Sequence, residues 1–193
     1  MEWLEHIDQQ LFLKIHLLRF YLLDITIPYL TSFVTWSPFF VIAIYFLYKK
    51  YLKKIVIVLL SFSLLIGISD HLSNLVKKSV KRYRPSHNLQ LKDKIISLEN
   101  YKGGQYGFVS SHAANSFGIA YLLILFFNEL KKRWKLLILA WAILICYTRI
   151  YLGVHYPSDI IGGSLIGLTA AFISKYIFNQ LEMIFYPLNH QSK

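Results

Sequence analysis

Cysteine occurs only once in this sequence, at Cys146. A single cysteine cannot form an intrachain disulfide, so disulfides within the chain do not stabilise this fold. Cys146 is also a poor candidate for a nucleophile, because it lies inside an apolar run and no anion-binding loop separates it from Arg149. We therefore expect a buried side chain without a chemical role.

The sequence also lacks internal repeats, low-complexity segments and any polar linker long enough to separate two domains. We therefore expect residues 1–193 to form a single domain. The N-terminus, Met1-Glu2-Trp3, has no basic region and no small-residue cleavage site, so it does not resemble a secretory signal.

Long apolar runs dominate the rest of the chain. Hydrophobic residues make up 55% of it and the mean hydropathy is +0.44, which is too apolar for an ordinary soluble domain. A helix needs about 20 mostly apolar residues to cross a bilayer. Five runs qualify: residues 26–48, 54–76, 111–128, 134–151 and 158–177. The sequence therefore predicts an all-α integral membrane protein, a bundle of about five transmembrane helices.

The N-terminal segment, residues 1–22, mixes Leu, Phe and Ile with charged residues at helical spacing. This pattern is typical of an amphipathic helix that lies in the membrane interface, and a short additional span is the alternative.

Basic residues outnumber acidic ones by 21 to 10, and they concentrate in segments that flank the apolar runs. The links after the first and third runs contain Lys49, Lys50, Lys53 and Lys54, and Lys131, Lys132, Arg133 and Lys135. Short basic links usually stay in the cytoplasm, so we expect both links there. Because the charge is confined to these segments, the lipid bilayer is the expected partner and nucleic acid is not.

Three short motifs stand at the opposite ends of the runs. They are Lys77-(six residues)-Arg84-Pro85, Ser110-Ser111-His112 and Thr148-Arg149-(five residues)-His155-(three residues)-Asp159. Helices that run alternately up and down bring these motifs to one face of the bundle. Arginine and lysine bind phosphate oxygens, and serines at a helix N-terminus add further donors. The predicted phosphate-binding residues are Lys77, Arg84, Ser110, Ser111 and Arg149.

His155 is the predicted nucleophile. A neutral imidazole can attack phosphorus when its other nitrogen donates to a carboxylate, and Asp159 is the obvious carboxylate. His112 would protonate the leaving group and later activate water. The cations would replace the metal of other phosphoryl-transfer sites, so we expect no metal and no cofactor. A metal bound by both histidines and Asp159 is the weaker alternative, since the cations would repel it.

Other polar residues near the motifs have two interpretations each. Asp70 shares a helical face with Lys77 and would either support the site or make a structural hydrogen bond. Lys78, Lys81 and Arg82 would either face lipid headgroups or help to bind a second phosphate.

The three motifs resemble the signature of the type 2 phosphatidic acid phosphatase superfamily: Lys-(six)-Arg-Pro, Pro-Ser-Gly-His and Ser-Arg-(five)-His-(three)-Asp. The resemblance covers Lys77 to Asp159 and implies a helical membrane bundle with the residue roles given above. Val109, Ser111 and Thr148 replace the proline, glycine and serine of that signature. Serine adopts some glycine conformations only with strain, but its N–H remains, so we expect activity to be retained with Ser111 at this position.

These patterns predict a membrane enzyme that removes phosphate from a lipid phosphate or diphosphate through a phosphohistidine. The resemblance points first to undecaprenyl pyrophosphate or phosphatidylglycerophosphate, and lipid A is an alternative. Two other functions remain as alternatives. The protein could bind phospholipid headgroups without catalysis, or it could transfer the phosphoryl group to an alcohol. Because the motifs lie opposite the basic links, we expect the loop at residues 77–110 to face the periplasm or outer leaflet of a bacterial cytoplasmic membrane.

Overall fold

The computed structural model describes residues 2–91, 94–96, 98 and 101–187. Its elements are α1 (Glu2–His16), α2 (Tyr21–Leu30), α3 (Phe33–Tyr51), η1 (Leu52–Lys54), α4 (Ile55–Val80), η2 (Pro85–His87), α5 (Ser111–Phe126), α6 (Lys132–Tyr151) and α7 (Pro157–Phe185). The predicted fold class, an all-α integral membrane protein, is confirmed.

Each predicted apolar run overlaps a long helix between α3 and α7, with one difference at the first run. That run bridges two helices, because the chain leaves helical geometry at Ser32. The Ser32 Oγ accepts a hydrogen bond from the Val34 N–H (3.3 Å) and so caps the start of α3. Among the described residues, three helical stretches are long and apolar enough to cross a membrane: Phe33–Val80, Lys132–Tyr151 and Pro157–Phe185. Five crossings therefore remain a prediction.

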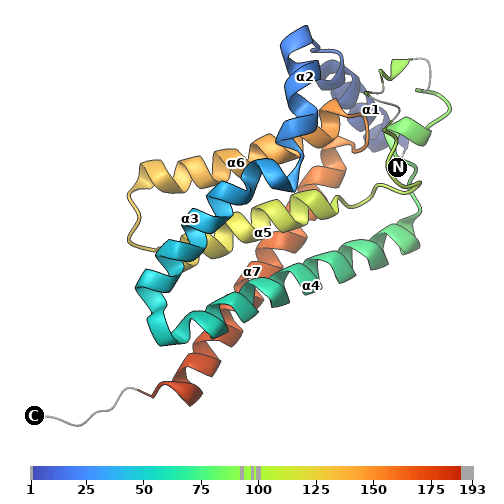
Figure 1. Cartoon of the computed structure of the whole chain (residues 1–193). Helices are drawn as coiled ribbons and strands as arrows, with labels where there is room; N and C mark the ends of the chain where they lie inside the picture. Colours follow the sequence, from blue (N-terminus) through green and yellow to red (C-terminus); the bar gives the residue numbers. More distant parts are fainter. Residues whose placement is uncertain (1, 92–93, 97, 99–100, 188–193) are drawn as a thin grey trace, which may run out of the picture.

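α5 is the central helix of the bundle. Figure 1 shows it between α4 and α6, with α7 crossing beside it, and α5 contacts all three. Its 16 residues are fewer than a membrane span usually needs. Because other helices surround α5, much of its apolar surface meets protein instead of lipid. Leu65, Leu122, Phe126, Ala171 and Phe178 are among the buried side chains of this core.

Small residues allow α5 and α7 to approach closely. A Cβ atom added at Gly163 would lie 2.3 Å from the Ser110 carbonyl oxygen. At Gly167 an added Cβ would lie 2.0 Å from the Ala114 carbonyl oxygen. Only glycine therefore fits at these two positions, and small residues commonly bring membrane helices into contact in this way. The contact fixes the start of α7 beside the start of α5.

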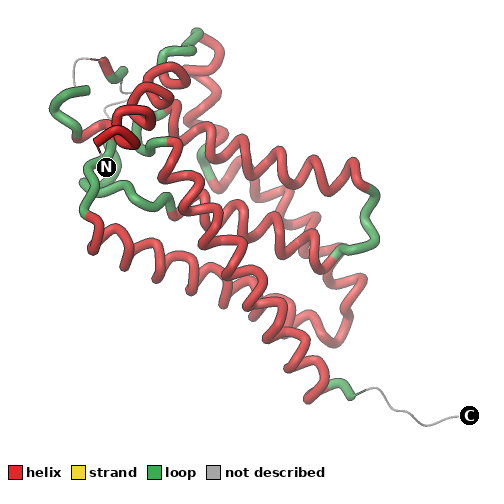
Figure 2. Tube along the Cα trace, turned by 180° about the vertical axis from the view of Figure 1, so that it is seen from behind, coloured by secondary structure: helices red, strands yellow, loops and turns green. Residues whose placement is uncertain are grey.

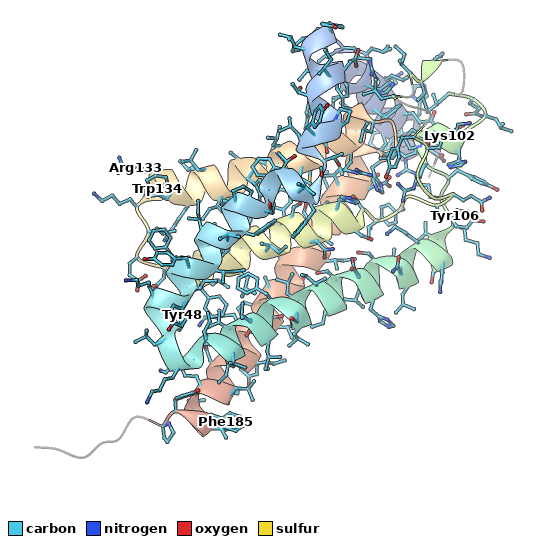
Figure 3. All side chains as sticks on the ribbon, in the orientation of Figure 1. Tyr48, Lys102, Tyr106, Arg133, Trp134 and Phe185 are labelled. Carbon is cyan, nitrogen blue, oxygen red and sulfur yellow. The ribbon has the colours of Figure 1, made fainter. Side chains whose placement is uncertain are left out.

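The two basic links meet at one end of the bundle, which we name the basic end. Lys50 contacts Glu129 (2.6 Å) next to the second link, and Lys54 contacts Glu182 (2.7 Å) near the end of α7. Figure 3 places Arg133 and Phe185 toward this end and Lys102 and Tyr106 at the opposite end, the loop end. Figure 2 shows from behind that loops gather beside the N-terminus, far from the C-terminal end of α7.

The N-terminal segment differs from the single helix expected over residues 1–22. α1 ends at His16 and α2 begins at Tyr21, with a turn between them. Phe12 and His16 are buried, and Phe12 packs against Ile150 and Tyr156. α1 therefore rests on the segment that joins α6 to α7, next to the third motif.

Candidate active site

A cavity of about 440 Å³ lies at the loop end, among the ends of α4, α5 and the α6–α7 connection. Its lining is Asn74, Lys77, Lys78, Arg84, Gly104, Gln105, Tyr106, Ser111, His112 and His155. Five of the eight residues predicted to form the site therefore line this one cavity. The other three, Ser110, Arg149 and Asp159, do not line this cavity and are buried.

Arg84 is held in the extended conformation that a following proline favours, with φ −65° and ψ 156°. Its Nε donates to the Tyr106 carbonyl oxygen (3.1 Å), and its Nη1 lies 3.4 Å from the His155 Nε2. Burial, and next the neighbouring Arg149, lower the pKa of Arg84. An arginine stays charged under these conditions, so a partly buried positive charge faces the imidazole.

His155 and Asp159 form a buried pair at the start of α7. Pro157 opens that helix, Asp159 falls in its first turn, and the His155 Nδ1 lies 3.3 Å from the Asp159 Oδ2. A carboxylate at this nitrogen favours the tautomer with the proton on Nδ1, which leaves the Nε2 lone pair facing the cavity. The pKa of His155 lies well below its usual 6.5, first because of burial and then because of Arg84 and Arg149. The imidazole is therefore neutral at neutral pH, as a nucleophile must be.

The start of α5 supplies the other cavity groups. The Lys77 Nζ donates to the Ser111 Oγ across the gap between α4 and α5. Ser110 is the N-cap of α5, and its Oγ accepts from the Ala113 N–H (3.3 Å). Ser111 is the first helical residue of α5, and non-glycine residues with positive φ among those described are Leu52 and Lys81. Ser111 therefore has helical backbone angles, which serine takes without strain, and not the positive φ that would favour glycine.

Arg149 is fixed by residues that the motifs did not indicate. Its Nη1 donates to the Thr31 Oγ1 (2.8 Å), and its Nη2 donates to the Tyr101 hydroxyl (3.0 Å). Its Nε is buried and has no partner among the described residues. The guanidinium is thus anchored at one edge and retains a free donor. The Thr148 hydroxyl donates to the Ile145 carbonyl (2.7 Å) within α6, and Thr148 does not line the cavity.

Sequence reasoning missed three polar contacts around the site. The Asn115 amide donates to Asp70 (2.9 Å), which gives Asp70 a structural partner on α5. Arg82 contacts both Asp8 and Asp159. The sequence showed only that Asp8 belongs to an amphipathic helix. That pattern does not indicate contact with Arg82, which is 74 residues away in the chain.

The chain matches the PAP2 superfamily over residues 55–183. It is 34% identical to a lipid A 4'-phosphatase of Bacteroides thetaiotaomicron, over 94% of this chain and 81% of the relative. A lipid A 4'-phosphatase of Porphyromonas gingivalis is 32% identical, over 87% of this chain and 71% of the relative. The crystal structure of LpxE from Aquifex aeolicus superposes with a TM-score of 0.68 at 28% identity, covering 88% of this chain and 95% of that one. The chain therefore belongs to the PAP2 superfamily, the type 2 phosphatidic acid phosphatase family whose motifs it carries.

Proposed function

We propose that this protein hydrolyses a phosphate monoester of a membrane lipid without a metal ion, through a phosphohistidine at His155. The family supports the class, a membrane lipid phosphatase. The observation that carries the mechanism is the position of His155, whose Nε2 lies 3.4 Å from the Arg84 Nη1 and whose Nδ1 lies 3.3 Å from the Asp159 Oδ2.

In the first step, the His155 Nε2 attacks phosphorus and the bond from phosphorus to the lipid oxygen breaks. His112, which lines the same cavity, would enter this step protonated, because the negative charge of the bound phosphate favours the imidazolium, and it would give that proton to the departing oxygen. In the second step, His112 takes a proton from water, the water oxygen attacks phosphorus, and the bond from phosphorus to nitrogen breaks. Inorganic phosphate and neutral His155 result, so both histidines return to their starting states.

The cations of the site and the backbone N–H groups at the start of α5 would stabilise the negative charge on the phosphoryl oxygens. Lys77 and Arg84 line the cavity, and Arg149 retains its buried Nε donor. The start of α5 adds backbone N–H groups at Ser111 and His112. Preorganised donors of this kind are a main source of catalysis in phosphoryl transfer.

Lipid A is the substrate we favour. The two relatives described above, named lipid A 4'-phosphatases, align over most of both chains. Undecaprenyl pyrophosphate and phosphatidylglycerophosphate, which the family resemblance pointed to first, become the next candidates. A cavity of about 440 Å³ accommodates a phosphate with part of its headgroup, so the acyl chains would remain in the bilayer.

The active site would face the periplasm or the outer leaflet of the cytoplasmic membrane, with α1 in the interface. This orientation is supported by the two basic links, which meet at the end opposite the cavity. A reporter fused after α7 tests it, because α7 ends at the basic end. Activity of a reporter that works only in the cytoplasm is expected, and activity of one that works only in the periplasm would refute the orientation.

The function is tested with purified full-length protein in detergent. Lipid A, undecaprenyl pyrophosphate, phosphatidylglycerophosphate and phosphatidate are offered separately, and released phosphate is measured with and without EDTA and vanadate. We expect fastest release from lipid A, no loss with EDTA, and inhibition by vanadate. A rapid acid-free quench with labelled substrate should trap phosphate on the wild-type protein.

His155→Ala should abolish both release and trapped label, while His6→Ala, at an exposed residue of α1, should retain them. Release from none of the lipids would instead favour a headgroup-binding protein. Loss of activity with EDTA would favour the metal alternative.

A further inference from the structure

Arg82 lies outside the catalytic cavity and touches the catalytic pair from behind. Its Nη1 donates to the Asp159 Oδ1 (3.1 Å), the carboxylate oxygen that His155 does not use. The same nitrogen donates to the Ser158 Oγ (2.7 Å). Its guanidinium carbon lies 4.0 Å from the centre of the Tyr156 ring, so an aromatic face limits its movement. Arg82 therefore holds the distal side of the catalytic carboxylate.

Asp8 of α1 holds Arg82 in turn. The Arg82 Nη2 donates to the Asp8 Oδ2 (2.6 Å), although the two residues are 74 positions apart in the chain. The Asp8 Oδ1 accepts from the Ser158 N–H (2.9 Å), and the Ser158 hydroxyl donates to the Asp8 Oδ2. Asp8 thus binds an unpaired N–H of the first turn of α7, where a negative charge is also favoured. The side chain of Asp8 is 9% exposed and that of Arg82 is 17% exposed.

Two ion pairs and a hydrogen bond connect α1 to the nucleophile, in the order Asp8, Arg82, Asp159 and His155. A fully buried carboxylate such as Asp159 requires a cation or several donors to stay ionised. The Tyr156 N–H and His155 satisfy Oδ2, and Arg82 satisfies Oδ1. Without Arg82, Oδ1 loses its charged donor and the carboxylate is free to rotate away from His155.

Asp8 and Arg82 are not part of the cavity where phosphate would bind. Asp8, Arg82 and Ser158 line a second hollow of about 1200 Å³ between α1 and the start of α7, which includes none of the eight predicted site residues. The match to the superfamily begins at residue 55, so Asp8 also lies outside the matched region. A direct role in binding the transferred phosphate is therefore excluded for Asp8 by its place and by its charge.

We propose that Arg82 and Asp8 are positioning residues for the Asp159–His155 pair, and that α1 is thereby a working part of the active site and not only a membrane anchor. Arg82 sets the orientation and charge of Asp159, and Asp8 sets the orientation of Arg82. This proposal rests on the proposed function of His155 as the nucleophile.

The test compares kcat and KM for Arg82→Gln, Arg82→Lys and Asp8→Asn in the full-length protein, on the lipid that wild-type protein hydrolyses fastest. We expect kcat to fall about tenfold or more in Arg82→Gln, because a charged hydrogen bond to a buried group is lost, with KM nearly unchanged. Arg82→Lys should recover part of the loss, since it restores the charge. Asp8→Asn should lower kcat by a smaller factor.

The matched controls remove a charge of the same sign nearby. Lys81→Gln controls for Arg82, and Glu5→Gln, one turn earlier on α1 at an exposed residue, controls for Asp8. Both controls should keep wild-type kcat. The double variant Asp8→Asn with Arg82→Gln should be about as slow as Arg82→Gln alone, because Asp8 acts through Arg82.

Thermal midpoints and gel-filtration profiles identify any variant that does not fold, and Asp8→Asn and Arg82→Lys then carry the test. If Arg82 and Asp8 only stabilised the fold, their replacement would lower the thermal midpoint and leave kcat of the folded protein unchanged. That result, or kcat losses equal to those of the controls, would overturn the proposal. Absence of turnover in the wild-type protein would instead refute the proposed function.

Discussion

Replacement of Gly167 by alanine tests whether helix contact deep in the bundle sets the geometry of the active site. The added Cβ would lie 2.0 Å from the Ala114 carbonyl oxygen, and ordinary van der Waals contact begins at 3.4 Å. α5 and α7 would therefore have to separate by roughly 1.4 Å at this point, by difference of those two distances. The obstruction is backbone, so a side-chain rotation cannot relieve it.

The expected cost has two parts. Overpacking of a close-packed interior destabilises proteins by about 1–3 kcal/mol, which corresponds to several degrees of thermal midpoint for a chain of this size. His112 lies at the start of α5 and Asp159 at the start of α7, so separation of the helices also displaces the acid from the nucleophile. A misplacement of about 1 Å can lower turnover by roughly 100-fold. We expect a marked fall in kcat even at temperatures where the variant is folded.

Gly67→Ala is the control. Gly67 is also a glycine inside a helix, α4, but an added Cβ would have no other atom within 4 Å. It should be neutral or slightly stabilising, since alanine favours a helix over glycine by up to about 1 kcal/mol. Phosphate release and the thermal midpoint are measured for both variants and wild type. Equal values for Gly167→Ala and Gly67→Ala would refute the close approach of the two backbones.

Three further predictions concern single residues of the site. Tyr101→Phe should raise KM severalfold with little change in kcat, because Arg149 loses one anchor; an unchanged KM would mean that Arg149 does not bind the substrate phosphate. The His155 ring should titrate well below 6.5 in NMR of labelled protein, and in Arg84→Gln its pKa should rise toward that value; no shift would contradict the cause given. Just below pH 6.5 the His155 ring is protonated in the unfolded chain but not in the folded protein. The free energy of unfolding should therefore decrease as the pH falls below 6.5, and unfolding experiments at several pH values measure this decrease. Ser111→Gly should keep kcat within about threefold, since the serine has helical angles and its N–H remains; a larger loss would assign the hydroxyl a role in catalysis.

The helices followed from sequence because a bilayer requires long apolar runs, and such runs are visible without a structure. Their internal breaks were harder to predict. Ser32 interrupts the first run through a local cap, and the N-terminal segment turns after His16. Both breaks depend on a few backbone angles, which hydropathy does not report.

The sequence by itself determined which chemical groups this protein has and at which helix ends they stand. Lys77, Arg84, His112 and His155 line one cavity, as the alternation of runs and motifs required. Only the tertiary structure decided which side chains stand behind them. Arg82 meets Asp8 and Asp159 over separations of 74 and 77 residues, through contacts that depend on how α1 packs. Motif spacing reflects local helix geometry, whereas these partners are selected by packing between distant segments.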